Sequence, residues 1–180
     1  MTLRLKVLTL VLVLLPAVHS ARAQGFALGT FHSFKGLGLS AEIPSSKPKE
    51  YNSFSLFADL ARVYTGDSPS PGVKFNMSHN IRIVDFKPRT ADRISLFSGA
   101  GFSAGWVRDS GKDCYGLTGA LSGTIGARAA FSCNIVLSLG ITLETGILLY
   151  KDNGHIKSTL YRDGIYQTVL PHLGIYYLFE

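Results

Sequence analysis

Long apolar runs are missing from most of this sequence, although 46% of its residues are hydrophobic. After residue 24 there is no run long enough for a membrane-spanning helix, which needs about 20 predominantly apolar residues. Helical periodicity is also scarce, since apolar residues seldom recur three and four positions apart. Charged residues make up only 17% of the chain. The apolar residues must therefore be distributed in a pattern other than the faces of helices.

Several chemical signatures are absent as well. Cys114 and Cys133 are the only cysteines, and their spacing does not match a zinc site. There is no glycine-rich phosphate loop, and the sequence points to no cofactor and no metal. The formal net charge of +6 falls to +3 if Arg4, Lys6 and Arg22 are removed with a leader segment. So small an excess gives no reason to expect a nucleic-acid partner.

The N-terminus has the organisation of a secretory signal peptide. Arg4 and Lys6 precede an almost wholly apolar stretch, 7–18, which is too short to span a bilayer. The small residues of "ARA" (21–23) suit signal-peptidase cleavage before Gln24. We therefore expect a signal peptide at 1–23 and one exported domain at 24–180. No linker or low-complexity tract divides this domain.

The exported part alternates apolar and small or polar residues with the period of a β-strand. In 133–149, for example, odd-numbered positions from Ile135 to Leu143 are aliphatic, while Asn134, Ser138 and Thr142 occupy even ones. Turn-forming residues separate such segments. The pattern predicts an all-β protein, a single antiparallel up-and-down barrel with both termini on one side and no α-helix after residue 24. Its eight strands are expected at about 25–33, 36–43, 51–64, 72–86, 92–108, 114–130, 133–150 and 165–179.

The first 20 residues of the domain allow two interpretations. Apolar residues occupy even positions at Phe26 and Leu28 but odd positions from Leu37 to Ile43. A change of parity within one strand would turn its side chains to the other face, so we expect a tight turn near 33–36. The alternative keeps 25–43 as one bulged strand and adds a short strand near 155–162. Both interpretations give eight strands.

The two faces of the strands indicate which way the barrel is oriented. A small soluble barrel needs a bulky apolar core and a charged exterior, and a lipocalin-like binder of that kind is one alternative. Here the non-apolar face carries mostly Gly, Ser, Thr, Asn and Ala, which suits the interior of a narrow transmembrane barrel. Three acids and three bases at mid-strand positions are expected to form an interior charge network: Glu42, Asp59, Lys74, Arg82, Arg128 and Glu144. Arg128 and Glu144 are expected to lie close together in it.

Other residues are assigned from their places along the strands. Cys114 and Cys133 flank the strand 114–130 at opposite ends, too far apart for a disulfide. Aromatic residues near strand ends are read as interfacial girdle residues rather than a ligand platform. These are Trp106, Tyr115, Tyr150, Tyr161 and Tyr166.

The C-terminal stretch "HLGIYYLF" (172–179) resembles the C-terminal β-signal of Gram-negative outer-membrane proteins. The matching positions are His172, Gly174, Tyr177 and Phe179, and the chain departs from the pattern by ending on Glu180. The exported chain as a whole resembles small eight-stranded outer-membrane barrels. "GLGLSAEI" and "GAGFSAGWVRD" are similar to segments of uncharacterised Bacteroidetes-type barrel proteins.

This resemblance implies an outer-membrane location in a Gram-negative bacterium, with membrane lipid and the barrel-assembly machinery as partners. A filled interior argues against a passive porin. The expected role is structural or interactive: a scaffold, a surface-loop adhesin or an accessory subunit of a larger outer-membrane complex.

An enzyme that modifies lipid A, a deacylase or an acyltransferase, is a further alternative. Such enzymes use a serine, a histidine and an acid near the membrane boundary. Ser78 and His79 are adjacent, however, so on a strand they point to opposite faces and cannot form a nucleophile–base pair. "HS" at 32–33 falls in the expected first turn, where the geometry is open. The sequence therefore predicts no catalytic residues.

Overall fold

The structure, a computed structural model, describes residues 25–64, 66, 71–109, 114–161 and 170–179. The expected signal peptide and its cleavage site lie outside these ranges, as does Tyr166. Nine strands and one short helix are present in the described residues. The strands are β1 (Phe26–Ser33), β2 (Gly36–Pro44), β3 (Glu50–Asp59), β4 (Gly72–Phe86), β5 (Arg93–Asp109), β6 (Cys114–Ala130), β7 (Ile135–Asp152), β8 (His155–Leu160) and β9 (Leu170–Phe179), and the helix is α2 (Ala61–Tyr64).

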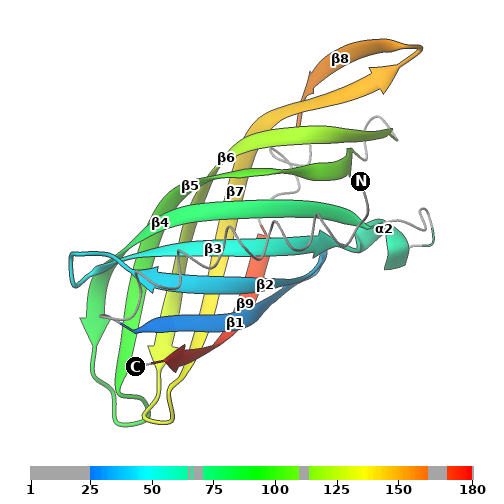
Figure 1. Cartoon of the computed structure of the whole chain (residues 1–180). Helices are drawn as coiled ribbons and strands as arrows, with labels where there is room; N and C mark the ends of the chain where they lie inside the picture. The colour runs from blue at the N-terminus through cyan, green and yellow to red at the C-terminus, as the bar shows by residue number, and fades with distance from the viewer. Residues whose placement is uncertain (1–24, 65, 67–70, 110–113, 162–169, 180) are drawn as a thin grey trace.

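The strands form one closed antiparallel barrel (Figure 1). Consecutive strands pair from β1 to β7, and β9 pairs with both β1 and the first half of β7. The second half of β7 pairs along the same edge with β8. β8 and β9 therefore share one position, and the ring has eight positions. The predicted all-β, up-and-down eight-stranded barrel is confirmed.

The two interpretations of the first residues are now distinguished. β1 ends at Ser33 and β2 begins at Gly36, so the tight turn is confirmed and the single bulged strand is wrong. The Ser33 hydroxyl accepts a hydrogen bond of 3.2 Å from the backbone N–H of Lys35, which stabilises the turn. The short strand of the second interpretation exists nonetheless. It is β8, which lengthens the wall beyond the start of β9.

Residues 51–64 do not form one strand, and the expectation of no helix after residue 24 is wrong at this point. The ladder between β2 and β3 ends where Gly36 faces Asp59. Beyond it, the backbone N–H of Leu60 donates to the Lys35 carbonyl over 2.7 Å, and that of Tyr64 donates to the Leu60 carbonyl over 2.9 Å. Without a neighbouring strand, the backbone satisfies its hydrogen bonds locally in the single turn of α2. Among the described residues, no helix has the length and apolar character needed to cross a membrane.

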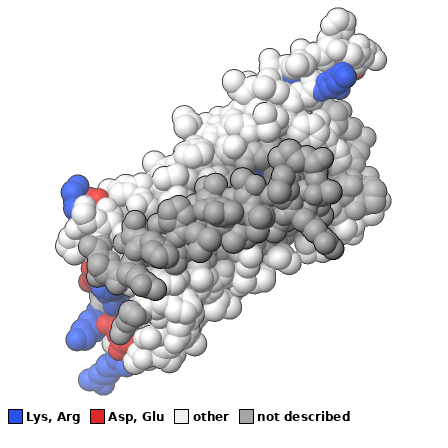
Figure 2. Space-filling model, in the orientation of Figure 1, with Lys and Arg blue, Asp and Glu red and all other residues white. Residues whose placement is uncertain are grey.

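The alternation of faces follows the predicted parity. On β7, the side chains of Leu139, Leu143 and Ile147 are exposed, whereas Ser138, Thr142 and Glu144 are buried. The same inversion holds on the other long strands, whose exposed positions include Leu56, Phe75, Phe102, Leu121 and Ile175. Figure 2 shows the result on one face of the molecule: Lys, Arg, Asp and Glu gather at the two ends, and the uncovered surface between them is almost entirely free of these residues.

The two ends of the barrel differ. The connections 45–49, 87–92 and 131–134 lie at one end, called here the turn end. The barrel's first and last strands also meet there, because Phe26 pairs with Phe179 and their rings stack at 4.7 Å. The expectation of both strand termini on one side is therefore confirmed. At the opposite, far end, the hairpin of β7 and β8 projects beyond the neighbouring strands (Figure 1).

The positions of the cysteines lead to a prediction. Cys114 begins β6 at the far end, while Cys133 is an exposed free thiol in the connection 131–134 at the turn end. At about 3.3 Å per residue, a strand of 17 residues separates them by tens of ångströms. A disulfide needs Cα atoms within about 7 Å. Alkylation of the unreduced protein followed by mass spectrometry should modify Cys133, whereas a linked Cys114–Cys133 peptide would contradict the register of β6.

Candidate functional site in the barrel interior

Two ion pairs cross the interior of the barrel. Lys74 on β4 and Glu144 on β7 lie 2.5 Å apart (Nζ to Oε2), and their side chains are only 7% and 1% exposed. Arg128 on β6 and Glu42 on β2 lie 2.6 Å apart (Nη2 to Oε2). Neither pair joins neighbouring strands. Each pair therefore spans the lumen and connects opposite walls.

Aromatic side chains surround both pairs. The Arg128 guanidinium lies 5.0 Å from the centroid of the Tyr51 ring, and Tyr51 meets Phe97 edge to face at 6.1 Å. The Lys74 ammonium lies 5.8 Å from the centroid of the Phe57 ring. These distances allow cation–π attraction, which is stronger in a site shielded from water. The pairs and rings together fill the middle of the lumen.

A small polar cavity remains among these groups. Its volume is 90 Å³, and both Glu42 and Glu144 contribute to its lining. Hydroxyl side chains form hydrogen bonds along its wall: Ser53 with Ser78 at 2.7 Å, and Thr124 with Thr142 at 3.0 Å. This volume holds a few water molecules and is far smaller than a solute channel.

The predicted charge network is brought together only in part. Glu42, Lys74, Arg128 and Glu144 form the two cross-lumen pairs. Arg82 lies near the turn end instead, where its Nη2 donates to the carbonyl of Pro48. Asp59 is half-buried at the opposite end of β3, where it faces Gly36 and Gly72.

The expected proximity of Arg128 and Glu144 is wrong. Both face the lumen from neighbouring strands, but Arg128 stands opposite Ser138, and Glu144 lies six residues further along β7. This offset amounts to roughly 20 Å along the strand. The connection 131–134, in which Asn134 adopts a φ of 60°, sets the register and so separates them. Each side chain pairs across the lumen instead of along the wall.

Sequence reasoning missed the aromatic residues of the lumen. Tyr51, Phe57, Phe97 and Tyr176 are buried inside the barrel. Their parity was the available signal, because the residues two positions away are polar or small on both sides of Tyr51, Phe57 and Phe97, and Gly174 lies two positions before Tyr176. Tyr150 and Tyr161 are likewise not girdle residues. Tyr161 is 3% exposed and packs with Val107 and Leu148, with Tyr150 alongside, while Trp106 faces outward at 54% exposure.

The residues of the C-terminal motif divide between the two faces of β9. His172 lines the interior cavity and meets Phe31 edge to face at 6.3 Å, and Gly174 is also buried. Gly140 stands opposite His172, where an added Cβ would come within 2.8 Å of the imidazole. Tyr177 and Phe179 face outward.

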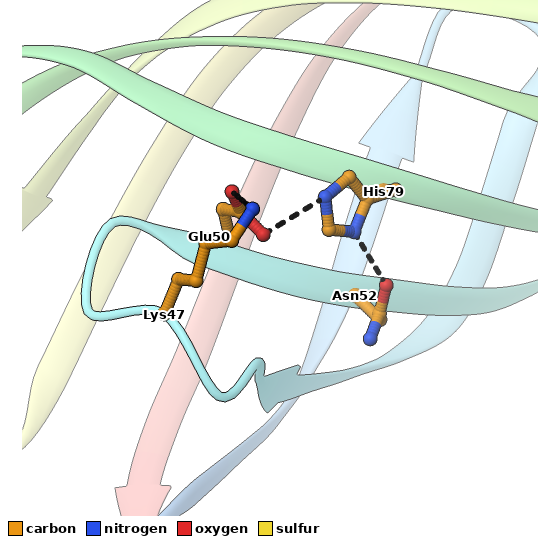
Figure 3. Close-up of polar contacts among 4 residues, drawn as sticks. All are labelled: Lys47, Glu50, Asn52 and His79. Atoms are coloured by element: carbon orange, nitrogen blue, oxygen red, sulfur yellow. Dashed lines mark hydrogen bonds and ion pairs between the residues drawn. The ribbon is translucent and has the colours of Figure 1, made fainter.

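One polar group lies on the outer wall near the connection 45–49 (Figure 3). The Nδ1 of His79 lies 2.9 Å from Oδ1 of Asn52, and its Nε2 lies 3.4 Å from Oε2 of Glu50. Glu50 also bonds Lys47 at 3.0 Å. Both imidazole nitrogens thus contact side-chain oxygens, while Ser78 is buried on the other face of β4. This geometry is that of a polar cluster and does not assemble a serine nucleophile with a histidine base.

An apolar outer belt around a closed antiparallel ring with a charged, hydrogen-bonded interior defines the class of transmembrane β-barrels. The opposite arrangement, an apolar interior with a charged exterior, would define a lipocalin-like soluble barrel, and the structure does not have it. Within the described residues, no group of three or more His, Cys, Asp and Glu side chains could hold a metal ion.

Comparison with known proteins finds a similar fold in one solved structure. No protein-family model and no curated protein matches the chain. Among solved structures, the barrel is similar to the crystal structure of a major outer membrane protein from Thermus thermophilus. The TM-score is 0.49 at 15% sequence identity, and the match covers 86% of this chain and 98% of that one.

Proposed function

We propose that this protein is an integral outer-membrane protein whose barrel serves as a closed, rigid platform for interactions and not as a pore. One observation carries the proposal: the barrel is apolar outside and bridged inside by two buried ion pairs. Only a lipid environment makes such an exterior favourable, because no water is available there to solvate charged groups. The proposal also includes membership of the small Gram-negative outer-membrane barrels, of the Bacteroidetes type, which the sequence resembles.

The interior supports the second half of the proposal. Lys74–Glu144 and Arg128–Glu42 obstruct the lumen, and Val107, Leu148 and Tyr161 form a separate apolar cluster. Because the lumen of such a platform is closed, partner molecules would bind at the far end, where the β7–β8 hairpin projects (Figure 1). A scaffold, an adhesin or an accessory subunit of a larger complex would use such a surface.

The proposal is tested with the folded protein in phospholipid vesicles. Membrane insertion should give a barrel whose gel mobility changes on boiling, and small sugars should remain trapped in the vesicles. A porin reconstituted in the same way is the positive control for leakage. Sugar release at a porin-like rate would contradict the closed interior. A protein that stays in the soluble fraction without detergent would contradict the membrane assignment.

The role of the C-terminal motif leads to a prediction for cells. Phe179→Ala removes one outward-facing ring, a loss of about 2–3 kcal/mol of apolar burial that a closed barrel can survive. Recognition by the assembly machinery depends on the terminal residues themselves. Outer-membrane levels of Phe179→Ala should therefore fall several-fold, while the purified variant still refolds in detergent. Leu139→Ala, a truncation on the same face of β7, is the control. Wild-type levels of Phe179→Ala would show that the motif is only a strand.

A further inference from the structure

A second cavity lies at the turn end of the barrel, apart from the small cavity between the ion pairs. Its volume is 450 Å³, and it is bounded by the connection 45–49 and by the ends of strands that reach this edge. Its lining includes Ser45, Ser46 and Pro48 near this connection, and Tyr51, Ser95 and Val136 from the strands. The cavity, called here the vestibule, has the volume of a small organic ligand.

The vestibule is lined mostly by positive charge. Its lining contains four cationic side chains, Lys47, Arg82, Arg93 and Arg128, and one acidic side chain, Glu50. Lys47 pairs with Glu50, and Arg128 pairs with Glu42. Within the described residues, no carboxylate lies within ion-pairing distance of Arg82 or Arg93. The carboxylate of Asp85, which stands opposite Ser95 on the neighbouring strand, interacts electrostatically with both Arg82 and Arg93. One acid shared by two guanidinium groups leaves one positive charge in excess, and therefore a net positive field in the cavity.

Unused hydrogen-bond donors add to this charge. The Nε groups of Arg82 and Arg128 are buried and have no hydrogen-bond partner among the described residues. A buried N–H without an acceptor costs free energy, and the cost is larger for a charged group. The three arginines come from three consecutive strands, β4, β5 and β6, and meet at one cavity. An acceptor with several oxygen atoms would satisfy donors from more than one of them.

We propose that the vestibule binds a phosphate group. Guanidinium forks match the oxygen geometry of phosphate and of carboxylate. A carboxylate has only two oxygens, whereas phosphate offers additional acceptors and up to two negative charges, which fits donors that converge from separate strands. The phosphate belongs either to a soluble phosphate ester or to a lipid headgroup that reaches the barrel edge.

The proposal is tested on the intact barrel folded in a maltoside detergent, which carries no phosphate. Inorganic phosphate is titrated at fixed chloride concentration and followed by calorimetry and by phosphorus NMR. We expect saturable binding that weakens at least tenfold in Arg93→Gln and less in Arg93→Lys, which keeps the charge but loses the fork. Arg93 begins β5 and is exposed, so its replacement spares the interior. Arg82→Gln is the second variant, and boiling-dependent gel mobility checks the folding of each.

Arg89→Gln is the matched control, because Arg89 is an exposed arginine in the connection 87–92, just before Arg93, and does not line the vestibule. It should bind phosphate as the wild type does. Micelles doped with phosphatidylglycerol identify the source: competition that depends on Arg93 assigns a lipid headgroup, and its absence assigns a soluble phosphate. The proposal is overturned if the wild type shows no saturable binding, or if folded Arg93→Gln and Arg82→Gln bind as tightly as Arg89→Gln.

Discussion

Glu144→Gln should lower the free energy of unfolding by about 3–5 kcal/mol, because Lys74 would then carry a buried charge without its partner. The two groups lie 2.5 Å apart with side-chain exposures of 7% and 1%, so the few water molecules that the adjoining cavity can hold would replace the lost carboxylate only in part. The opposing walls β4 and β7 would also lose a direct connection. Urea unfolding of the barrel in detergent micelles or vesicles measures the change as a shift of the midpoint.

Two variants give this prediction its controls. Thr145→Gln changes the neighbouring residue on the outer face of β7 and should shift the midpoint far less. The double variant Lys74→Met, Glu144→Gln removes both charges and should recover most of the stability, because the cost of an unpaired buried charge is gone. If Glu144→Gln and Thr145→Gln unfold at the same urea concentration, the cross-lumen pair does not stabilise the barrel.

Ile175→Arg should prevent stable insertion both in cells and in vesicles. Ile175 faces outward on β9, where it pairs with Thr30 and Leu137, between the charged ends of the barrel. An arginine on the lipid face costs about 2–4 kcal/mol near the bilayer midplane and much less near the interfaces. The fraction of protein with boiling-dependent gel mobility after folding into vesicles measures the effect.

The hairpin beyond the neighbouring strands provides a matched control for this substitution. Ile156 on β8 is 81% exposed and lies at the far end, so Ile156→Arg makes the same chemical change outside the proposed membrane zone. We expect it to fold as the wild type does. Equal folding yields for Ile175→Arg and Ile156→Arg would mean that the outer face of β9 does not contact lipid.

The sequence was sufficient to predict the class of fold and the direction of most side chains. Both follow from a period of two, which is a local property that Ser138, Leu139 and Gly140 already display. The turn between β1 and β2 could also be predicted, because the change in parity across Ser33 leaves few other solutions.

Contacts across the lumen could not be predicted in the same way. Whether Arg128 meets Glu144 or Glu42 depends on the register of every intervening strand and on the stagger of the closed ring. The register shift between Arg82 and Val84 on β4 illustrates the difficulty, since the sequence there carries no glycine to mark a bulge. The helix α2 was missed because its backbone conformation results from where the ladder between β2 and β3 stops, at Gly36 and Asp59.

The vestibule was missed for a related reason. Arg82 was assigned to the same network as Lys74 because both occupy positions whose side chains should point into the barrel. The alternation of faces does not, however, give a residue's position along the barrel axis. Arg93 lies at the first position of β5 and did not fit a mid-strand pattern. Residues that line a cavity at the edge of a barrel come from connections and strand ends, where periodic patterns are weakest.

The pairing of Phe26 with Phe179 also determines the order of events during folding. These residues belong to the first and last strands, so the contact that closes the ring has the largest sequence separation in the described chain. Closing so long a loop is entropically costly and slow, and it cannot begin until the C-terminal strand has been synthesised. Every earlier intermediate has two unpaired strand edges and an exposed apolar face, which together favour aggregation. The chain must therefore be shielded from other copies of itself until β9 pairs with β1.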